Sequence, residues 1–405
     1  MRRRAGVDRV LVLNHFASPE GQPGGTRHIE LYGGLDGWSC EILAADRNYL
    51  TRLPQHSYRP NPTTAYRTVW TLPYAGNGAA RILNWASYAL TATVVGLLTR
   101  RPSVVVGSTP HLLAPLGAWL VARVRRVPFV LEVRDLWPEV LVEMGQLRPD
   151  SRLYRALEAL ASWVVARADA VVVLAPGVGT ALVERGADPA LVHLVSNGAD
   201  LVRPLADRTR ARAALGAGAD DVLVVYAGAH GPANGLDLAL DAAADVAVDH
   251  PEVHFVFVGD GPSKAALVER ARRDGLSNVR FEDPRPKSAM PEVLGAADVG
   301  LHVLADVGLF TFGVSPNKVF DYMAAGLPVL TNVPGDVGGL VTANGAGVAV
   351  DPDGIADGVR TLLATPAEER AGMGDHGRAL IEREYAVAPR VAALEAVLRG
   401  ARSGR

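Results

Sequence analysis

The chain of 405 residues is long enough for two ordinary domains, and its 49% hydrophobic residues can fill two cores, which excludes a disordered or fibrous protein. Its single cysteine, Cys40, excludes an internal disulfide or a cysteine cluster for a metal, and indicates a reducing compartment. The net charge of −2 hides an asymmetry, because residues 1–126 hold 15 arginines against 6 acidic residues.

That basic first part fits an anionic partner such as a membrane surface or a phosphate-linked acceptor. Nucleic acid is disfavoured as a partner, because the sequence has no helix-turn-helix, zinc-finger or aromatic-plus-basic pattern. The N-terminus has arginines at positions 2–4, followed by only a short apolar run at 10–13. A signal peptide needs a longer apolar segment and a small-residue cleavage site, so we expect a cytoplasmic protein.

Apolar runs rich in β-branched residues alternate with longer helical stretches, which predicts βαβ units with helices on both faces of parallel sheets. We predict an α/β fold with two Rossmann-like, doubly wound domains, 1–200 and 201–385, and a last helix within 386–405. Ligands are expected at the carboxyl ends of the strands. The predicted strands are 10–13, 39–44, 104–107, 129–133 and 170–174 in the first domain, and 222–227, 254–259, 279–281, 299–303 and 329–330 in the second.

Residues 82–98 form a run of seventeen residues without a charge, flanked by Arg81 and by Arg100 and Arg101. The run is at the short limit for crossing a bilayer, contains polar residues and precedes another predicted strand, which favours a buried or interfacial helix over a membrane span. If one face is exposed, its apolar side and arginine flanks fit a membrane surface.

In the first domain, polar and glycine-rich segments follow the predicted strands. Glycines in the segment 21–28, notably Gly24 and Gly25, let the backbone approach a ligand closely. His111 follows the strand 104–107, where an imidazole can hydrogen-bond a ligand or stabilise charge on a leaving group. A flexible surface loop and an unused histidine are the alternatives.

Charged residues crowd the end of the strand 129–133. Glu132, Arg134 and Asp135 must pair with other groups or face a ligand, because burying an unpaired charge is costly. We interpret them as acceptor-binding residues or as site architecture. A purely structural Arg134–Asp135 network is the alternative.

The most informative motif is SPNKVFDYMAAGLPV, residues 315–329. Pro316 near the first turn and Gly326 at the end predict a short helix whose free amides and positive dipole end attract anions. Lys318 adds a full charge beside them, and Asp321, one turn later, can accept hydrogen bonds from a ribose diol. The motif predicts a diphosphate site, with an ordinary solvated helix start as the alternative.

Taken together, these motifs resemble those of family-four retaining glycosyltransferases of the GT-B fold, in particular the branch of bacterial N-acetylfucosaminyltransferases of surface-polysaccharide assembly. The resemblance covers almost the whole chain. It implies a nucleotide-sugar donor, with a UDP-linked N-acetylated or deoxy sugar expected, a sugar or lipid-linked acceptor, no metal cofactor, and a last helix that packs back on the first domain. It is carried by the segments 14–16, 24–27, 74–78, 132–139, 226–228, 259–262 and 315–330.

The resemblance also implies roles for individual residues. Lys318 and the base-binding loop after the strand 279–281 lie in the expected donor site. The implied donor-binding residues are Gly24, Gly25, Gly228, Ser315, Asn317 and Lys318 for the diphosphate, Asp321 for the ribose, Phe312, Gly313 and Val314 for the sugar, and Arg285 and Pro286 for the base.

Two departures from the family pattern bear on mechanism. The family's paired glutamates map onto Gly313 and Asp321, and its usual arginine and lysine map onto Ala229 and Asn234. Because Gly313 cannot act as a nucleophile, we expect same-face transfer through an oxocarbenium-like state, with Lys318 and loop amides stabilising the leaving diphosphate.

Two other functional classes fit the same fold. A UDP-sugar 2-epimerase needs no second substrate, and the basic first domain and the run 82–98 weigh against it. A nucleotide-sugar-binding protein without activity is kept open by Gly313 and Ala229. Within the transferase class, a soluble natural-product acceptor is the alternative to a lipid-linked one.

Overall fold

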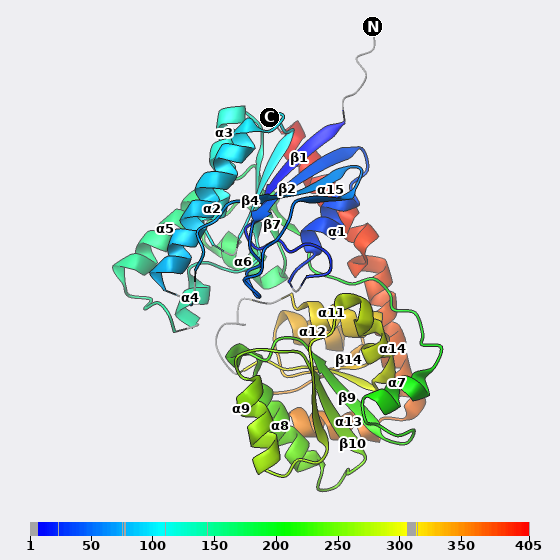
Figure 1. Cartoon of the computed structure of the whole chain (residues 1–405). Helices are drawn as coiled ribbons and strands as arrows, with labels where there is room; N and C mark the ends of the chain where they lie inside the picture. The colour runs from blue at the N-terminus through cyan, green and yellow to red at the C-terminus, as the bar shows by residue number, and fades with distance from the viewer. Residues whose placement is uncertain are drawn as a thin grey trace. The chain divides into compact units, whose positions relative to one another are not determined.

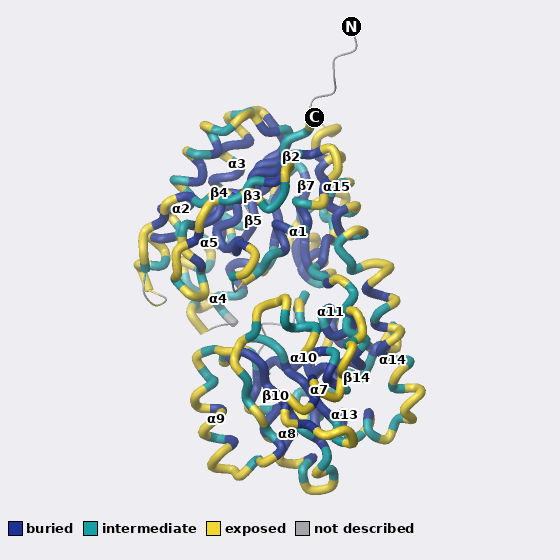
Figure 2. The backbone as a smooth tube through the Cα atoms, turned by 45° about the vertical axis from the view of Figure 1, so that its right-hand side comes forward, coloured by how far each residue is buried: buried dark blue, intermediate teal, exposed yellow. Residues whose placement is uncertain are grey.

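The computed structural model describes residues 7–22, 24–74, 76, 78–109, 111–143, 145–305, 313 and 315–404 (Figure 1). The chain divides into two compact units, residues 1–196 with 387–405, and residues 197–386. In each unit the central strands are buried, whereas the strands at the two edges of each sheet are partly exposed and helices expose their outer faces (Figure 2).

The first unit is built on an eight-stranded sheet in the order β3-β4-β2-β1-β5-β6-β7-β8. All neighbouring strands are parallel except the antiparallel pair β3 and β4. The strands are β1 (Asp8–Leu13), β2 (Trp38–Ala45), β3 (Tyr58–Asn61), β4 (Thr64–Val69), β5 (Val104–Ser108), β6 (Phe129–Val133), β7 (Ala170–Val173) and β8 (Val192–Leu194).

Helices cover both faces of this sheet, so alternate residues of one strand enter different cores. In β1, Val10 and Val12 pack in one cluster with the last helix, α15, whereas Leu11 and Leu13 approach α2 and α3 on the other face. The helices are α1 (Arg27–Gly33), α2 (Ala79–Leu98), α3 (Leu113–Arg125), α4 (Glu139–Glu143), α5 (Arg152–Val165), α6 (Pro176–Glu184) and α15 (Val387–Ser403), with a 3-10 turn at Pro189–Leu191.

The second unit has an all-parallel six-stranded sheet in the order β11-β10-β9-β12-β13-β14. Its two faces form separate clusters, because Leu223 and Val225 pack on one side of β9 and Val224 and Tyr226 on the other. The strands are β9 (Val222–Ala227), β10 (Val253–Val258), β11 (Val279–Glu282), β12 (Val299–His302), β13 (Val329–Thr331) and β14 (Gly347–Ala349).

The helices of the second unit lie on both faces of its sheet (Figure 1). They are α7 (Arg208–Ala214), α8 (Leu236–Val246), α9 (Lys264–Arg273), α10 (Met290–Ala296), α11 (Asn317–Ala324), α12 (Asp336–Ala343), α13 (Ile355–Ala364) and α14 (Ala367–Leu380), with 3-10 turns at Pro232–Asn234 and Lys287–Ala289 and a π-helical turn at Ile381–Tyr385.

Strand order reverses direction once in each sheet. In the first unit the chain moves from β1 to β2 on one side and later to β5 on the other, and in the second unit β10 and β12 flank β9 in the same way. Ligands of open α/β sheets bind outside the carboxyl ends of the strands at such switch points. The loops after β1 and β5, and after β9 and β12, are therefore the places to search for function.

The ten strands predicted from the sequence are confirmed, and all of them except the edge strand β11 lie inside their sheets. Four strands were missed: β3 and β4, which are rich in polar residues and lie at an edge, and the three-residue β8 and β14. The run 82–98 belongs to α2, and no helix among the described residues is long and apolar enough to cross a membrane. The last helix, α15, packs on α1, β5, β6 and β7 of the first unit.

Candidate functional site

Charged side chains are paired in a buried network at the carboxyl edge of the first sheet. The carboxylate of Glu132, which is 1% exposed, accepts hydrogen bonds from His28 Nε2 and Ser108 Oγ, each at 2.7 Å. The guanidinium of Arg27 lies 3.5 Å from the same carboxylate and donates to the carbonyl groups of residues 195–196 at 2.5 Å.

The pairing fixes the charge of Glu132. Burial alone raises the pKa of this carboxyl, but His28, Arg27 and the hydrogen bonds outweigh burial and hold the pKa well below its usual range. Burial lowers the pKa of His28, so the imidazole is neutral near pH 7 and its Nδ1 accepts from Asn14 Nδ2 at 2.8 Å. Glu132 is therefore paired within this unit, which favours site architecture over acceptor binding among its two predicted roles.

The neighbouring predicted residues are arranged differently. Arg134 donates its backbone N–H to Thr109 Oγ1 at 2.7 Å, and its guanidinium lies near Gly25, 3.9 Å from where a Cβ of that glycine would stand. Gly24 packs against Ser18. No ion pair joins Arg134 to Asp135 among the described residues, but the charge of Arg134 counteracts the burial that raises the pKa of Asp135, so a structural Arg134–Asp135 network remains an alternative.

Two buried histidines meet at the switch point of the first sheet. His111 Nδ1 accepts from the backbone N–H of Ala114 at 3.3 Å, so its proton is on Nε2, which donates to His15 Nδ1 at 2.7 Å. His15 therefore carries its proton on Nε2. Burial lowers the pKa of His111 to about 3 and that of His15 well below its usual value, so both rings are neutral.

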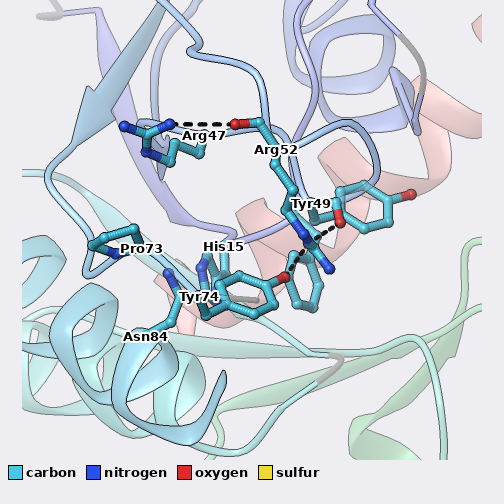
Figure 3. A pocket seen from close by; sticks show the side chains of 8 residues that line it. His15, Arg47, Tyr49, Arg52, Pro73, Tyr74 and Asn84 are labelled. Atoms are coloured by element: carbon cyan, nitrogen blue, oxygen red, sulfur yellow. Dashed lines mark hydrogen bonds between the residues drawn. The ribbon is translucent and has the colours of Figure 1, made fainter. Parts of the chain in front are cut away.

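This arrangement changes which histidine is available to a ligand. Both nitrogens of His111 are used within the protein, and its ring stacks on Trp85 at 5.0 Å. The nitrogen left over belongs to His15, which lines a pocket (Figure 3). Sequence reasoning selected His111 and missed His15, although the segment 14–16 directly follows the first strand.

In the second unit, Lys318 lies at the start of α11 against the turn after β9. Its Nζ donates to Tyr226 Oη at 2.9 Å and lies 4.2 Å from the centre of that ring. Nζ is also 3.4 Å from where a Cβ of Gly228 would stand, so side chain and backbone turn are adjacent. No carboxylate pairs with Lys318 among the described residues, and burial lowers the pKa of its ammonium to about 7.

Two buried imidazoles close to Lys318 have unused nitrogens. His230 is fully buried and neither ring nitrogen has a partner among the described residues, and Nε2 of the fully buried His302 has none either. Burial is the main cause that lowers the pKa of both. The charge of Lys318 adds to it for His302, whereas for His230, whose pKa falls to about 4, Lys264 contributes more than Lys318. Buried polar atoms normally have hydrogen-bond partners, so these unused atoms indicate a place for a polar ligand.

The backbone around Lys318 is tightly organised. A Cβ on Gly259 would lie 1.9 Å from the carbonyl oxygen of Gly228, so only glycine lets these two turns approach. The loop before α11 is held by Asn197, whose backbone N–H donates to Ser315 Oγ at 3.0 Å and whose Nδ2 donates to Ser315 O at 2.6 Å. Asn197 was missed, because nothing in the sequence signals a partner 118 residues away.

The structure describes most of the other residues predicted for the donor site. Asn317 begins α11, and Asp321 lies one turn after Lys318 and is partly buried. Arg285 pairs with Glu282 at 3.2 Å, and Pro286 is exposed in the loop after β11. Gly313 has a φ of 86°, whereas Phe312 and Val314 lie outside the described residues.

Comparison with known proteins decides the family. A family model described as "Glycosyl transferase 4-like domain" matches residues 4–198, and one described as "Glycosyl transferases group 1" matches residues 221–365. The chain belongs to the group 1 glycosyltransferases.

Curated relatives of this glycosyltransferase carry transferase names. It is 26% identical over 290 residues to the probable glycosyltransferase WbjE of Pseudomonas aeruginosa, covering 71% of this chain and 72% of that protein. It is 24% identical over 317 residues to the putative colanic acid biosynthesis glycosyl transferase WcaI of Escherichia coli, covering 75% of this chain and 77% of that protein.

Solved structures show the fold. A sucrose-phosphate synthase from Thermosynechococcus elongatus matches with a TM-score of 0.79 at 16% identity, over 98% of this chain and 100% of that one. HepE from Anabaena, solved with UDP and glucose, matches with a TM-score of 0.71 at 17% identity, over 97% and 99%. The prediction of a GT-B fold is confirmed.

Proposed function

We propose that this glycosyltransferase is a retaining enzyme that moves a sugar from a UDP-sugar to an acceptor hydroxyl. The observation that carries the proposal is the donor edge of the second sheet, where the ammonium of Lys318 lies beside the Gly228 turn and has no acidic partner in the part of the chain that the structure describes. The unused nitrogens of His230 and His302 lie near it. A cation, free amides and buried donors at a switch point fit a diphosphate, and HepE, similar in fold, was solved with UDP.

In the proposed mechanism, Lys318 and the amides of the adjacent turn and helix start stabilise the charge on the leaving diphosphate. Gly313 offers no carboxylate, so the acceptor enters on the same face as the leaving group, which removes the acceptor proton. We propose that Ser315 and Asn317 add donors to the diphosphate, Asp321 binds the ribose diol, and the Arg285–Pro286 loop faces the base. The main-chain amide of Gly313 is the described part of the proposed sugar site, and the predicted contributions of Phe312 and Val314 lie outside the described residues.

The roles in the first unit follow from its hydrogen bonds. His111 is a positioning residue, because it holds His15 in one tautomer. We propose that His15 presents its N–H to the sugar or acceptor, and that Gly24, Gly25 and Arg134 form the neighbouring wall. Because Lys318 supplies the positive charge, we expect transfer to continue when EDTA is present.

The direct test is incubation of the whole protein with a panel of labelled UDP-sugars, with and without acceptor sugars. Transfer of an N-acetylated deoxy sugar with retained anomeric configuration, read by NMR, supports the proposal and its N-acetylfucosaminyl branch. Epimerised UDP-sugar without acceptor identifies a 2-epimerase instead. Tight UDP binding with neither reaction identifies a binding protein.

We further propose a lipid-linked acceptor and peripheral attachment to an anionic, cytoplasmic membrane face. Apolar side chains are exposed along α2 and the adjacent α3, with Leu98 at 81% and Leu90 at 67% exposure. Exposed arginines at one end of these helices add positive charge that complements anionic lipid. This α2–α3 face comprises Ile82, Leu83, Leu90, Val94, Leu98, Leu120 and Val124, with Arg100, Arg101, Arg123 and Arg126.

Co-sedimentation with anionic vesicles across a salt series tests the attachment. Binding should weaken as salt rises, because the arginines are exposed, and should fall in a Leu90→Ser, Leu98→Ser variant. Val248→Ser removes an exposed apolar residue of the second unit, at 84% exposure, and should leave binding unchanged. No binding at low ionic strength would favour a soluble natural-product acceptor.

A further inference from the structure

A polar pocket lies wholly within the first unit (Figure 3). It has a cavity volume of about 70 Å³ and is bordered by the loops after β1, β2 and β4 and by the start of α2. None of its lining residues within the described part of the chain is acidic. Those that matter chemically are His15, Arg47, Tyr49, Arg52, Tyr74 and Asn84.

One hydrogen-bond donor of this pocket is rigidly fixed. The tautomer of His15 puts a proton on Nε2, and this nitrogen has no partner among the described residues. The ring cannot turn freely, because it stacks between Tyr88 at 4.3 Å and Phe16 at 4.6 Å and is 3% exposed. His15 thus offers a preorganised N–H to whatever occupies the pocket.

A guanidinium group is fixed beside it. Arg52 has a positive φ of 62°, donates to Tyr49 O and Tyr74 Oη, and stacks over the Tyr74 ring at 4.1 Å. Arg47 lines the same pocket and donates to the carbonyl of Arg52 at 3.4 Å (Figure 3). Neither arginine forms an ion pair with a described residue. Both lie in the loop after β2.

The pocket therefore holds uncompensated positive charge. Burial is the main cause that lowers the pKa of Arg81, which lies outside the pocket lining, and the charge of Arg52 lowers it further, so the positive potential of Arg52 extends beyond the pocket. A phosphate bound by Arg52 would offset that potential. Planar guanidinium groups bind phosphate through paired hydrogen bonds, which favours a phosphorylated ligand over a neutral sugar.

We infer that this pocket binds the phosphate or diphosphate group of the acceptor, so that the acceptor is an anionic sugar rather than a neutral one. The inference rests on the proposed transferase function and deepens it. Arg52 and Arg47 bind the phosphate oxygens, and His15 donates one further hydrogen bond. The buried Oδ1 of Asn84, which has no partner among the described residues, accepts from a sugar hydroxyl.

The test is calorimetric titration of the full chain, saturated with UDP, with inorganic diphosphate. We expect a second binding event that weakens about ten- to a hundredfold in Arg52→Gln, the cost of one lost charge-assisted contact, and several-fold in Arg47→Gln. Arg59→Gln, which removes an exposed cation of β3 away from the pocket, should leave the affinity unchanged. Diphosphate affinity insensitive to both pocket arginines would overturn the inference.

Two further arms keep the outcome clear. If wild-type protein does not bind UDP, the donor proposal fails, and titrating Lys318→Ala with diphosphate still reports on the pocket. If Arg52→Gln does not fold, the diphosphate affinity of Arg47→Gln, a variant at an exposed position, still tests the inference. If glucose 1-phosphate competes with diphosphate, the acceptor is a soluble sugar phosphate. If only a prenyl diphosphate in micelles competes, the acceptor is lipid-linked. If neither competes, the inference is contradicted.

Discussion

The carboxyl edges of the two sheets differ in how their buried charged and polar side chains are paired. In the first unit Glu132 satisfies His28 and Arg27 within the protein. In the second unit Lys318 has no acidic partner among the described residues, and His230 has two unused ring nitrogens. An edge that is internally paired provides architecture, whereas an edge with polar groups left over is ready for a ligand that supplies the missing partners.

The largest expected effect is a loss of stability when the paired network of the first edge is broken. Glu132→Gln leaves Arg27 buried without its counter-charge, so the free energy of unfolding should fall by about 3–5 kcal/mol. Urea denaturation measures the loss. Glu20→Gln, an exposed position in the same unit, should change it by less than about 0.5 kcal/mol. If the two variants were equally stable, the paired network would not hold the first edge together.

The second edge should respond to pH in ligand affinity. Burial lowers the pKa of Lys318 to about 7 from an ordinary 10.5, so the free protein loses this charge above neutrality. UDP affinity measured by calorimetry should fall as pH rises from 7, by up to about tenfold per unit. The same titration with Lys318→Met should be nearly flat over this range, and a parallel decline in both proteins would assign the effect to another group.

The lowered pKa of Lys318 also affects the stability of the fold. Stability should rise with pH over the range in which UDP affinity falls. Between pH 7 and 10.5 the unfolded chain keeps the Lys318 proton that the folded chain has lost, so folding gains stability as pH rises through this window. The unfolding free energy of wild type relative to Lys318→Met should therefore increase. A decrease would mean that Lys318 gains an acidic partner on folding.

A smaller effect is expected one turn along the same helix. Asp321→Asn keeps the size of the side chain but removes its charge, so UDP should bind about five- to tenfold more weakly, at about 1 kcal/mol for one hydrogen bond to the ribose. A UDP analogue without the ribose diol should bind wild type and Asp321→Asn with the same affinity. An unchanged affinity for UDP would remove Asp321 from the site.

The sequence was informative where function depends on neighbours along the chain. The parallel strands follow from apolar β-branched runs, and the position of Lys318 at a helix start follows from the spacing of Pro316, Lys318 and Gly326. The sequence could not show contacts between distant segments. His28 and Glu132 are 104 residues apart, and the His15–His111 hydrogen bond joins two loops that only the sheet brings together.

The central claim is that Lys318 binds the donor diphosphate, and UDP titration of the full chain tests it most directly. We predict that Lys318→Ala weakens UDP binding about ten- to a hundredfold, the cost of one charge-assisted contact. Arg272→Ala removes one positive charge from an exposed position in the same unit and should leave the affinity unchanged. Equal affinity of wild type and Lys318→Ala for UDP would contradict the account.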